Sequence, residues 1–128
     1  MMPTPVLLRE VAERYAATVG TKDADAYAAL FTEDAIQIDP YPSGRHVGRD
    51  EIRDFIQSSF DACETIAFDL EAVHPVGDVA AVSFDISMTM AGADQVMHIR
   101  GVEVFTVTDD GQISEVTAYW GDEDVTFE

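Results

Sequence analysis

The sequence predicts one α+β domain in which helices cover one face of a bent antiparallel sheet. Apolar residues recur at the helical spacing of three and four as far as about residue 62, and from about residue 66 they alternate with polar ones. Helices followed by a run of strands are typical of the α+β class. No linker, repeat or low-complexity tract divides the 128 residues, so we expect a single domain over residues 1–128.

The first half of the chain predicts three helices. The first covers about Pro5–Val19, with Thr4 as its N-cap and Gly20 as its end. A short second helix follows Asp23, which is a typical capping residue, and a third covers about residues 50–62. Each helix carries one apolar face, so all three are expected to pack on the sheet.

The strands predicted from alternation complete the element order α-α-β-α-β-β-β-β. A short strand at residues 35–39 lies between the second and third helices. The later strands cover about residues 66–72, 82–90, 97–108 and 113–120. A sheet that curls over its helices can enclose a cavity, and such cavities are usual ligand sites.

The charge balance excludes several classes of partner. The chain has 25 acidic and 7 basic residues and a formal net charge of −18. Binding of nucleic acid or anionic membranes depends on Lys and Arg, so we expect neither partner. No apolar run approaches the roughly 18 residues of a membrane span, and no export signal is visible at the N-terminus. Because the single Cys63 cannot form an intramolecular disulfide, we expect a cytoplasmic protein.

Three polar residues stand where the pattern predicts apolar faces or turns. Glu103 lies on the more apolar row of its strand, so it either is buried with a partner or a proton, or faces water at a sheet edge. Tyr15 lies on the apolar face of the first helix, as an ordinary core tyrosine or as part of a site. Asp39 ends a short β-run before Pro40, where a solvated turn residue is the simplest interpretation.

Motifs for other chemistry are absent from the sequence. His46, His74 and His98 have no metal-ligand spacing among themselves or with Cys63. There is no serine nucleophile motif, glycine-rich phosphate loop or dinucleotide fingerprint. We therefore expect neither a metal nor a cofactor.

Taken together, the three polar positions resemble those of the ketosteroid isomerases. The residues that carry the resemblance are Arg14-Tyr15, Asp39-Pro40 and the acid Glu103, with further similarity in the runs 28–35, 48–55 and 111–121. This family belongs to the superfamily named after nuclear transport factor 2, which includes the SnoaL-like proteins. The resemblance covers about residues 8–127 and implies a cone-shaped, curved antiparallel sheet packed on three helices.

The resemblance also implies a role for each polar residue. Asp39 matches the general base that shuttles a proton, and Tyr15 matches the phenol of the oxyanion hole. Glu103 matches a protonated acid that donates beside it, where the family has an aspartate. Some members have further tyrosines that support the phenol, but Phe31 and Ile56 stand at the positions where we expect them.

The activity implied is that of a cofactor-independent steroid Δ-isomerase, which acts on a 3-oxo-Δ5-steroid-like ketone through a dienolate. We expect five side chains to contact this apolar ketone: Phe55, Phe84, Met88, Phe105 and Trp120. The family commonly dimerises through the outer face of its sheet, and the apolar late strands (Val102, Val104, Val116 and Ala118) fit a homodimer.

Two alternatives remain open, because one fold can host many functions. The first is another pocket enzyme on the same scaffold, such as a polyketide cyclase or a dehydratase, which typically adds a second histidine or a different polar pair. The second is a non-catalytic domain that binds a hydrophobic ligand or a protein partner.

Overall fold

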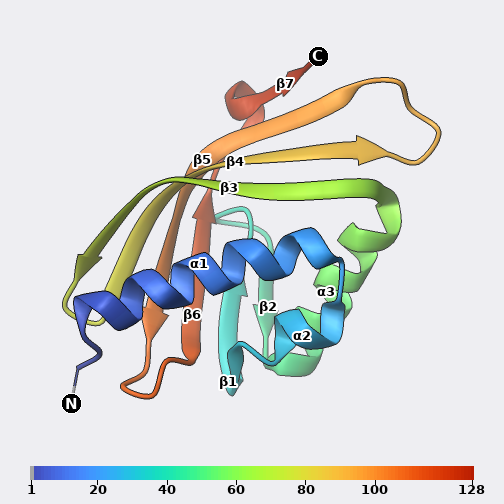
Figure 1. Cartoon of the computed structure of the whole chain (residues 1–128). Coiled ribbons are helices and arrows are strands. Elements are labelled where there is room, and N and C mark those ends of the chain that lie inside the picture. The colour runs from blue at the N-terminus through green and yellow to red at the C-terminus, as the bar shows by residue number, and fades with distance from the viewer. Residues whose placement is uncertain (1) are drawn as a thin grey trace.

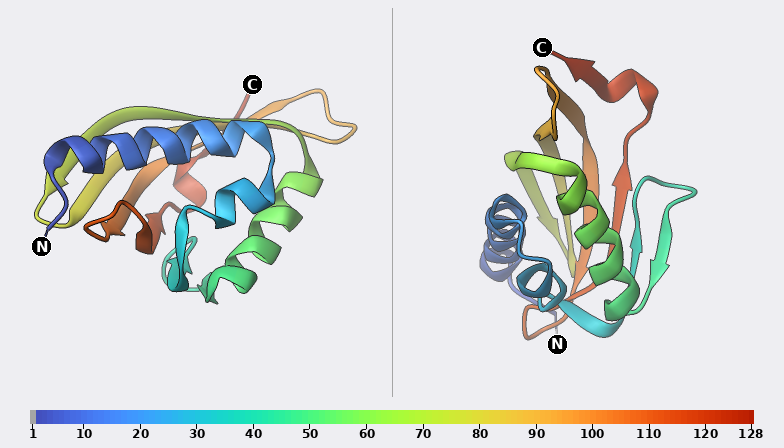
Figure 2. Two further views of the ribbon diagram at one scale, coloured as in Figure 1. Left: turned by 60° about the horizontal axis from the view of Figure 1, so that its bottom comes forward. Right: turned by 90° about the vertical axis from the view of Figure 1, so that its right-hand side faces the viewer.

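The computed structural model describes residues 2–128. Its helices pack against one face of a curved sheet (Figure 1). The helices are α1 (Pro5–Thr21), α2 (Ala24–Ala28), α3 (Arg49–Ala62) and the short 3-10 helix η1 (Asp122–Asp124). The strands are β1 (Phe31–Ile38), β2 (Arg45–Val47), β3 (Cys63–Val76), β4 (Val79–Met90), β5 (Val96–Val107), β6 (Ile113–Tyr119) and β7 (Val125–Phe127). Figure 2 shows the sheet bending over α1, α2 and α3, which confirms the predicted fold class.

The sheet is mixed, and this corrects the prediction of a purely antiparallel sheet. Its strand order is β2-β1-β6-β5-β4-β3, with β7 added beside β5. Strands β3 to β6 form the predicted antiparallel meander, but β1 pairs with β6 in parallel. Parallel pairing needs a long crossover, which α3 and the meander supply. The strands β2 and β7 were missed because three residues are too few to show a period.

The first helix begins where predicted but ends later. The side chain of Thr4 accepts a hydrogen bond of 3.1 Å from the backbone N–H of Leu7. The helix continues past Gly20, and Lys22 takes the left-handed conformation at its end, with φ of 57°. The predicted end at Gly20 was therefore wrong by about two residues, and the Lys22 ammonium donates to the carbonyl of Cys63 at 2.6 Å at the observed end.

The core lies between the helices and the concave face of the sheet. Its largest fully buried aromatic side chains are Tyr27, Phe31, Phe60, Phe84 and Phe105. Burying each such ring stabilises the fold by about 1.5–3 kcal/mol. Two polar side chains, Gln37 and Glu103, lie in the same core with only 1% of their surface exposed. The core is therefore apolar except at a few defined positions.

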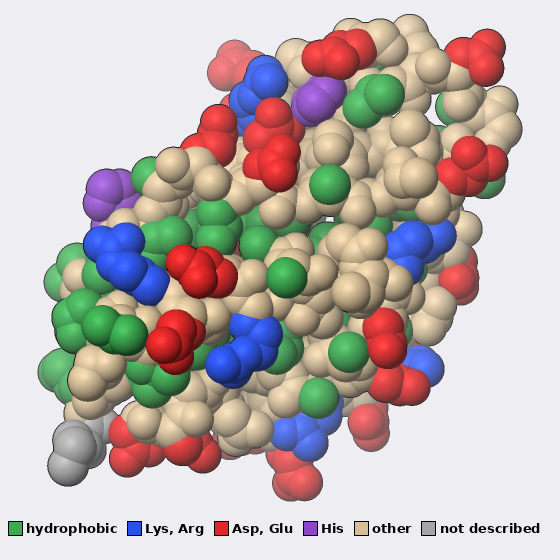
Figure 3. All heavy atoms as spheres, in the orientation of Figure 1, with side chains coloured by type: hydrophobic (Ala, Val, Ile, Leu, Met, Phe, Trp, Pro, Cys, Tyr) green, Lys and Arg blue, Asp and Glu red, His purple; other side chains and the backbone are tan. Residues whose placement is uncertain are grey.

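The surface carries the acidic excess. Figure 3 shows Asp and Glu side chains scattered over one face of the molecule, with the few Lys and Arg side chains among them. Within residues 2–128, no helix is both long enough and apolar enough to cross a membrane.

Gly101 in β5 offers a test of how tightly the concave face is packed. A Cβ at this position would lie 2.5 Å from the carbonyl oxygen of Tyr119 and 3.2 Å from Phe84. We predict that Gly101→Ala lowers the free energy of unfolding by about 1–3 kcal/mol, because the added methyl overpacks the sheet. Urea denaturation measures this change. Gly121→Ala is the matched control, since a Cβ added at this position would have no neighbour within 4 Å. Equal losses of stability in both variants would contradict the prediction.

Candidate active site

An apolar cavity of about 250 Å³ lies between the helices and the concave face of the sheet. Its lining comes mainly from apolar side chains, namely Val19, Pro40, Phe55, Ile56, Ile66, Phe68, Ile86, Met88, Ile99 and Trp120. Tyr15, Asp39, Ser59 and Glu103 are the polar members of this lining. The structure therefore brings the three candidate catalytic residues of the sequence, from α1, the end of β1 and β5, into one cavity.

Asp39 and Glu103 reach this cavity from opposite sides of β6. Glu103 pairs with Ala118 across the β5–β6 ladder. On the other edge of β6, the backbone N–H of Tyr41 donates to the carbonyl of Ala118 at 2.8 Å, which places the segment after β1 at the same level. Neighbouring strands lie about 4.8 Å apart, so the two acids are anchored roughly 10 Å apart. The small side chain of Ala118 lies between their anchoring points.

Asp39 is held at the end of β1 by its own loop and by Trp120. Its backbone N–H donates to the carbonyl of Gly44 at 2.8 Å, and the indole N–H of Trp120 donates to its Oδ1 at 2.9 Å. Desolvation raises the pKa of Asp39 above its usual value, whereas the Trp120 hydrogen bond and the charge of His46 oppose this shift. The result is a positioned carboxylate that is more basic than one in water, as a general base requires.

Glu103 is the most deeply buried acid of the site. It is 1% exposed, and its Oε2 has no hydrogen-bond partner within residues 2–128. Burial raises the pKa of Glu103 well above its usual value, the charge of Asp39 raises it further, and the hydroxyl of Tyr15 opposes the shift. This shift favours the protonated form over a wider pH range than in water, and a protonated carboxyl is a hydrogen-bond donor.

Tyr15 is fixed by aromatic packing and by a second phenol. Its ring makes edge contacts with Phe68 and Phe105, at centroid distances of 5.4 and 4.8 Å. Its hydroxyl lies 3.0 Å from the hydroxyl of Tyr27, which also accepts a 2.7 Å hydrogen bond from the Nε2 of Gln37. Burial, with the charge of Glu103, raises the pKa of Tyr15 well above its usual value, so this phenol stays neutral and can donate.

Tyr27 and Gln37 are site residues that the sequence analysis missed. The resemblance placed the supporting tyrosines at positions 31 and 56, whereas α2 supplies one at Tyr27. The signal for Gln37 was present, because it alternates with Ala35 and Asp39 on one face of β1, where an apolar residue is expected. The hydrogen bond from Trp120 to Asp39 had no sequence signal, since 81 residues separate the two.

Of the five side chains expected to contact the ketone, Phe55, Met88 and Trp120 line the cavity. Phe84 and Phe105 are not part of this lining. Both are fully buried behind other rings. Phe84 stacks on Phe68 at 5.1 Å, and Phe105 packs edge-on against Tyr15, so the rings in front of them form the cavity wall instead.

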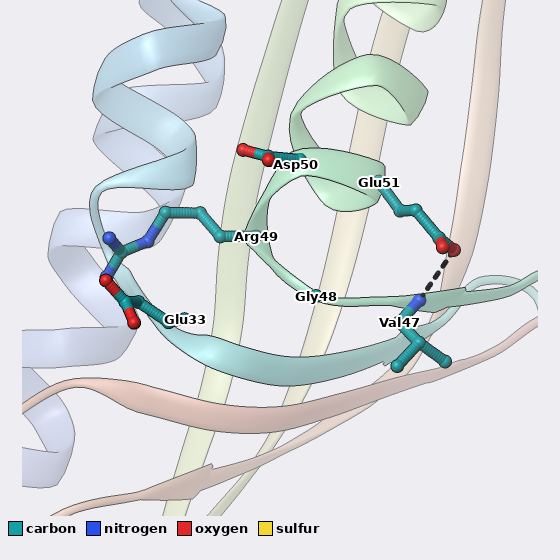
Figure 4. A pocket seen from close by; sticks show the side chains of 6 residues that line it. All are labelled: Glu33, Val47, Gly48, Arg49, Asp50 and Glu51. Atoms are coloured by element: carbon teal, nitrogen blue, oxygen red, sulfur yellow. Dashed lines mark hydrogen bonds between the residues drawn. The ribbon is translucent and has the colours of Figure 1, made fainter.

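A second hollow, of about 420 Å³, lies at the start of α3 and is polar (Figure 4). Two of its charged side chains form hydrogen bonds with the backbone. Arg49 donates to the carbonyl of Phe31, and Glu51 accepts from the N–H of Val47 at 3.0 Å. Within residues 2–128, no group of three His, Cys, Asp or Glu side chains is placed to hold a metal ion. We therefore assign the candidate site to the apolar cavity.

A curved sheet over three helices, with acids inside an apolar cavity, defines a small-molecule pocket domain of the nuclear transport factor 2-like class. The family model of the SnoaL-like domain matches residues 12–116, and the chain belongs to this family. Its relatives include the steroid Delta-isomerase of Nocardioides simplex, which is 34% identical over 112 residues, or 88% of each chain.

A solved structure supports the same fold. The epoxide hydrolase/cyclase-like enzyme SalBIII, described for pyran ring formation in the polyether salinomycin, superimposes with a TM-score of 0.85. The two proteins are 27% identical, and the match covers 94% of this chain and 95% of the other. The chain is therefore similar to proteins named for two different reactions.

The protonation of Glu103 should be visible in the pH dependence of stability. The usual pKa of its side chain is 4.5, and the folded value is higher. Between these values the unfolded chain is ionised while the folded protein holds a proton, so the free energy of unfolding falls as pH rises through this window. Glu103→Gln removes this term, and we predict that it stabilises the protein by more than about 1 kcal/mol at pH 8 relative to pH 4.

Urea denaturation at the two pH values measures the difference between variant and wild type. Glu123→Gln is the matched control, because Glu123 is exposed. An equal effect of Glu103→Gln at both pH values would show that folding does not raise the pKa of Glu103 and would contradict the prediction.

Proposed function

We propose that this protein is a cofactor-independent steroid Δ-isomerase that acts on an apolar ketone of the 3-oxo-Δ5-steroid type. The observation that carries the proposal is the convergence of Asp39, Tyr15 and Glu103 on one apolar cavity. The relative named steroid Delta-isomerase supports the choice of substrate class. The low exposure of Tyr15 and Glu103 adds the dry environment in which a hydrogen bond to a developing charge is strongest.

In the proposed reaction, the carboxylate of Asp39 takes a proton from the carbon between the carbonyl and the double bond. The electron pair of this C–H bond moves into a conjugated dienolate, whose oxygen carries the negative charge. Asp39 then returns the same proton to the far carbon of the former double bond, which gives the α,β-unsaturated ketone. No atom is gained or lost, so the reaction requires one base and no co-reactant.

The dienolate oxygen would be stabilised by two neutral donors. Tyr15 stays protonated because burial raises its pKa, and the carboxyl of Glu103 holds a proton for the same reason. Donors of this kind are aligned before the reaction and act in a low-dielectric site. The side chain of Glu103 is one methylene longer than the family's aspartate, and its unpaired Oε2 remains available to an acceptor in the cavity.

A second candidate is a cyclase on the same scaffold. The structural similarity to SalBIII supports it, and so does His46, which the sequence analysis did not connect with the site. The imidazole of His46 stacks on Phe55 of the cavity wall at 4.2 Å, and its charge acts on Asp39. A histidine near the pocket acid is the feature expected of such enzymes.

The isomerase proposal predicts distinct losses in two variants. Asp39→Asn removes the base and should reduce turnover of a 3-oxo-Δ5-steroid to background, whereas Tyr15→Phe removes one donor and should reduce it about 10²–10³-fold. The conjugated enone product absorbs in the ultraviolet where the substrate does not, so its formation can be followed directly. Gln95→Glu, at an exposed position away from the cavity, should retain full activity.

Three other outcomes would contradict this proposal. Full activity in Asp39→Asn would exclude Asp39 as the base. Steroid binding without turnover in the wild type, unchanged in Asp39→Asn, would indicate the binding domain. Neither binding nor turnover of steroids would favour the cyclase class.

We also propose a homodimer formed through the outer face of the sheet. Val102 and Tyr119 pair across β5 and β6 and are 43% and 45% exposed. The ring of Tyr41 packs at a tilt against that of Tyr119, with centroids 5.3 Å apart. Val116 and Ala118, also named from the sequence, are buried and cannot contribute. Sedimentation should show a dimer that Val102→Arg converts to a monomer, because a charge would be buried. A wild-type monomer at all concentrations would exclude this assembly.

A further inference from the structure

We propose that Gln37 is a positioning residue that sets the direction in which Tyr15 donates its proton. This inference rests on the proposed function, since it concerns how the oxyanion hole is oriented. The amide of Gln37, the phenol of Tyr27 and the phenol of Tyr15 form one hydrogen-bonded series that ends at the cavity. We call this series the amide–phenol relay.

The three side chains of the relay are buried from water, so each of their protons has few possible acceptors. Gln37 is 1% exposed, Tyr27 0% and Tyr15 3%. The described contacts give the Tyr27 hydroxyl two partners, the Nε2 of Gln37 at 2.7 Å and the hydroxyl of Tyr15 at 3.0 Å. A buried hydroxyl that donates to nothing is destabilising, so each proton must be placed on one of these atoms or on a group in the cavity.

The direction follows from the amide. The Nε2 of Gln37 can only donate, so the Tyr27 oxygen accepts from it. If Tyr15 also donated to Tyr27, the proton of Tyr27 would have no acceptor. Tyr27 therefore donates to Tyr15, and the proton of Tyr15 is free to point at an acceptor in the cavity. This is the arrangement that an oxyanion hole needs.

The opposite amide orientation would reverse the relay. With Oε1 facing Tyr27, the amide would accept, Tyr27 would donate to it, and Tyr15 would donate inward to Tyr27. Tyr15 would then present only lone pairs to a substrate oxygen. In the structure Oε1 has no hydrogen-bond partner, so the amide leaves its acceptor unpaired and uses its donor. The polarity of the whole relay thus depends on which end of one amide faces Tyr27.

The backbone explains why Gln37 can hold this role. It lies two residues before Asp39, so both side chains extend from the concave face of β1. Its backbone pairs in parallel with Val116 on β6 and antiparallel with His46 on β2, which fixes it from both sides. One strand therefore positions the base and orients the donor.

Gln37→Glu tests the direction of the relay. The titratable groups around this position are Tyr15, Tyr27, Glu103, Asp39 and, on the neighbouring strand β2, His46. A protonated carboxyl at position 37 can still donate to Tyr27, but an ionised one can only accept and reverses the relay. We expect kcat to fall about 10²-fold below wild type as pH rises and the new carboxyl ionises, with little change in KM.

Two further variants separate direction from charge and from folding. In a Tyr27→Phe background the relay is cut, so adding Gln37→Glu should change kcat far less than it does in the wild type. An equal loss in both backgrounds would mean that the added charge acts directly, and would overturn the inference. Gln37→Met keeps the length without the amide and should lower kcat about 10-fold at every pH; full activity in this variant would also overturn it.

A binding measurement keeps this inference separate from the isomerase proposal. The oxygen of an ionised 2-naphthol is an acceptor like that of a dienolate, and its fluorescence reports ionisation. We expect the wild type to bind 2-naphthol in the ionised form and Gln37→Glu to bind it at least about 10-fold more weakly at high pH. This result without steroid turnover would refute the proposed function and keep the inference. Binding that is absent from the wild type, or unaffected by Gln37→Glu, would refute the inference itself.

Discussion

The parallel pairing of β1 with β6 is the contact on which the site depends. It joins a strand from the first third of the chain to the last strand of the meander and aligns Gln37 with Val116. With this register, Asp39 emerges beside Ala118, whose other neighbour is Glu103. A shift by one residue would turn Gln37 and Asp39 to the opposite face, away from the cavity. The packing of α3 beneath β1 and β2 then closes the cavity with Phe55.

Asp39 and Glu103 share one cavity but have different partners for their charge. Both pKa values are raised by burial, but Asp39 has Trp120 and His46 to stabilise its charge, whereas the second oxygen of Glu103 is unpaired. The charge of Asp39 also opposes ionisation of Glu103. Ionising one acid therefore favours protonation of the other, which is the separation of base from donor that the proposed mechanism needs. Replacing Trp120 would remove a hydrogen bond that lowers the pKa of Asp39, so the pKa values of the two acids would become less different.

The sequence predicted what local pattern encodes. The period of apolar residues located α1, α3 and the meander, and the capping residues Thr4 and Asp23 were correct because capping is a local interaction. The parallel β1–β6 contact was missed because no local pattern specifies a pairing partner so distant in the chain. In the cavity, Glu103 stood out in the sequence as an acid on an apolar row, whereas Tyr15 and Asp39 were singled out by the resemblance. Tyr27 was missed because the resemblance placed no supporting tyrosine at this position and a core tyrosine alone is ordinary.

The unpaired buried oxygens indicate where stability is exchanged for function. Within residues 2–128, the buried side-chain oxygens without a hydrogen-bond partner belong to Gln37 and Glu103. A fold selected only for stability would replace both residues by apolar ones, since each unpaired group costs about 1–3 kcal/mol. Gln37 lies at the end of the relay that is farther from the cavity. Glu103 is the second donor of the proposed oxyanion hole. Polar groups kept at such a cost, and at the two ends of one arrangement, are expected where a ligand oxygen must be held in a fixed direction.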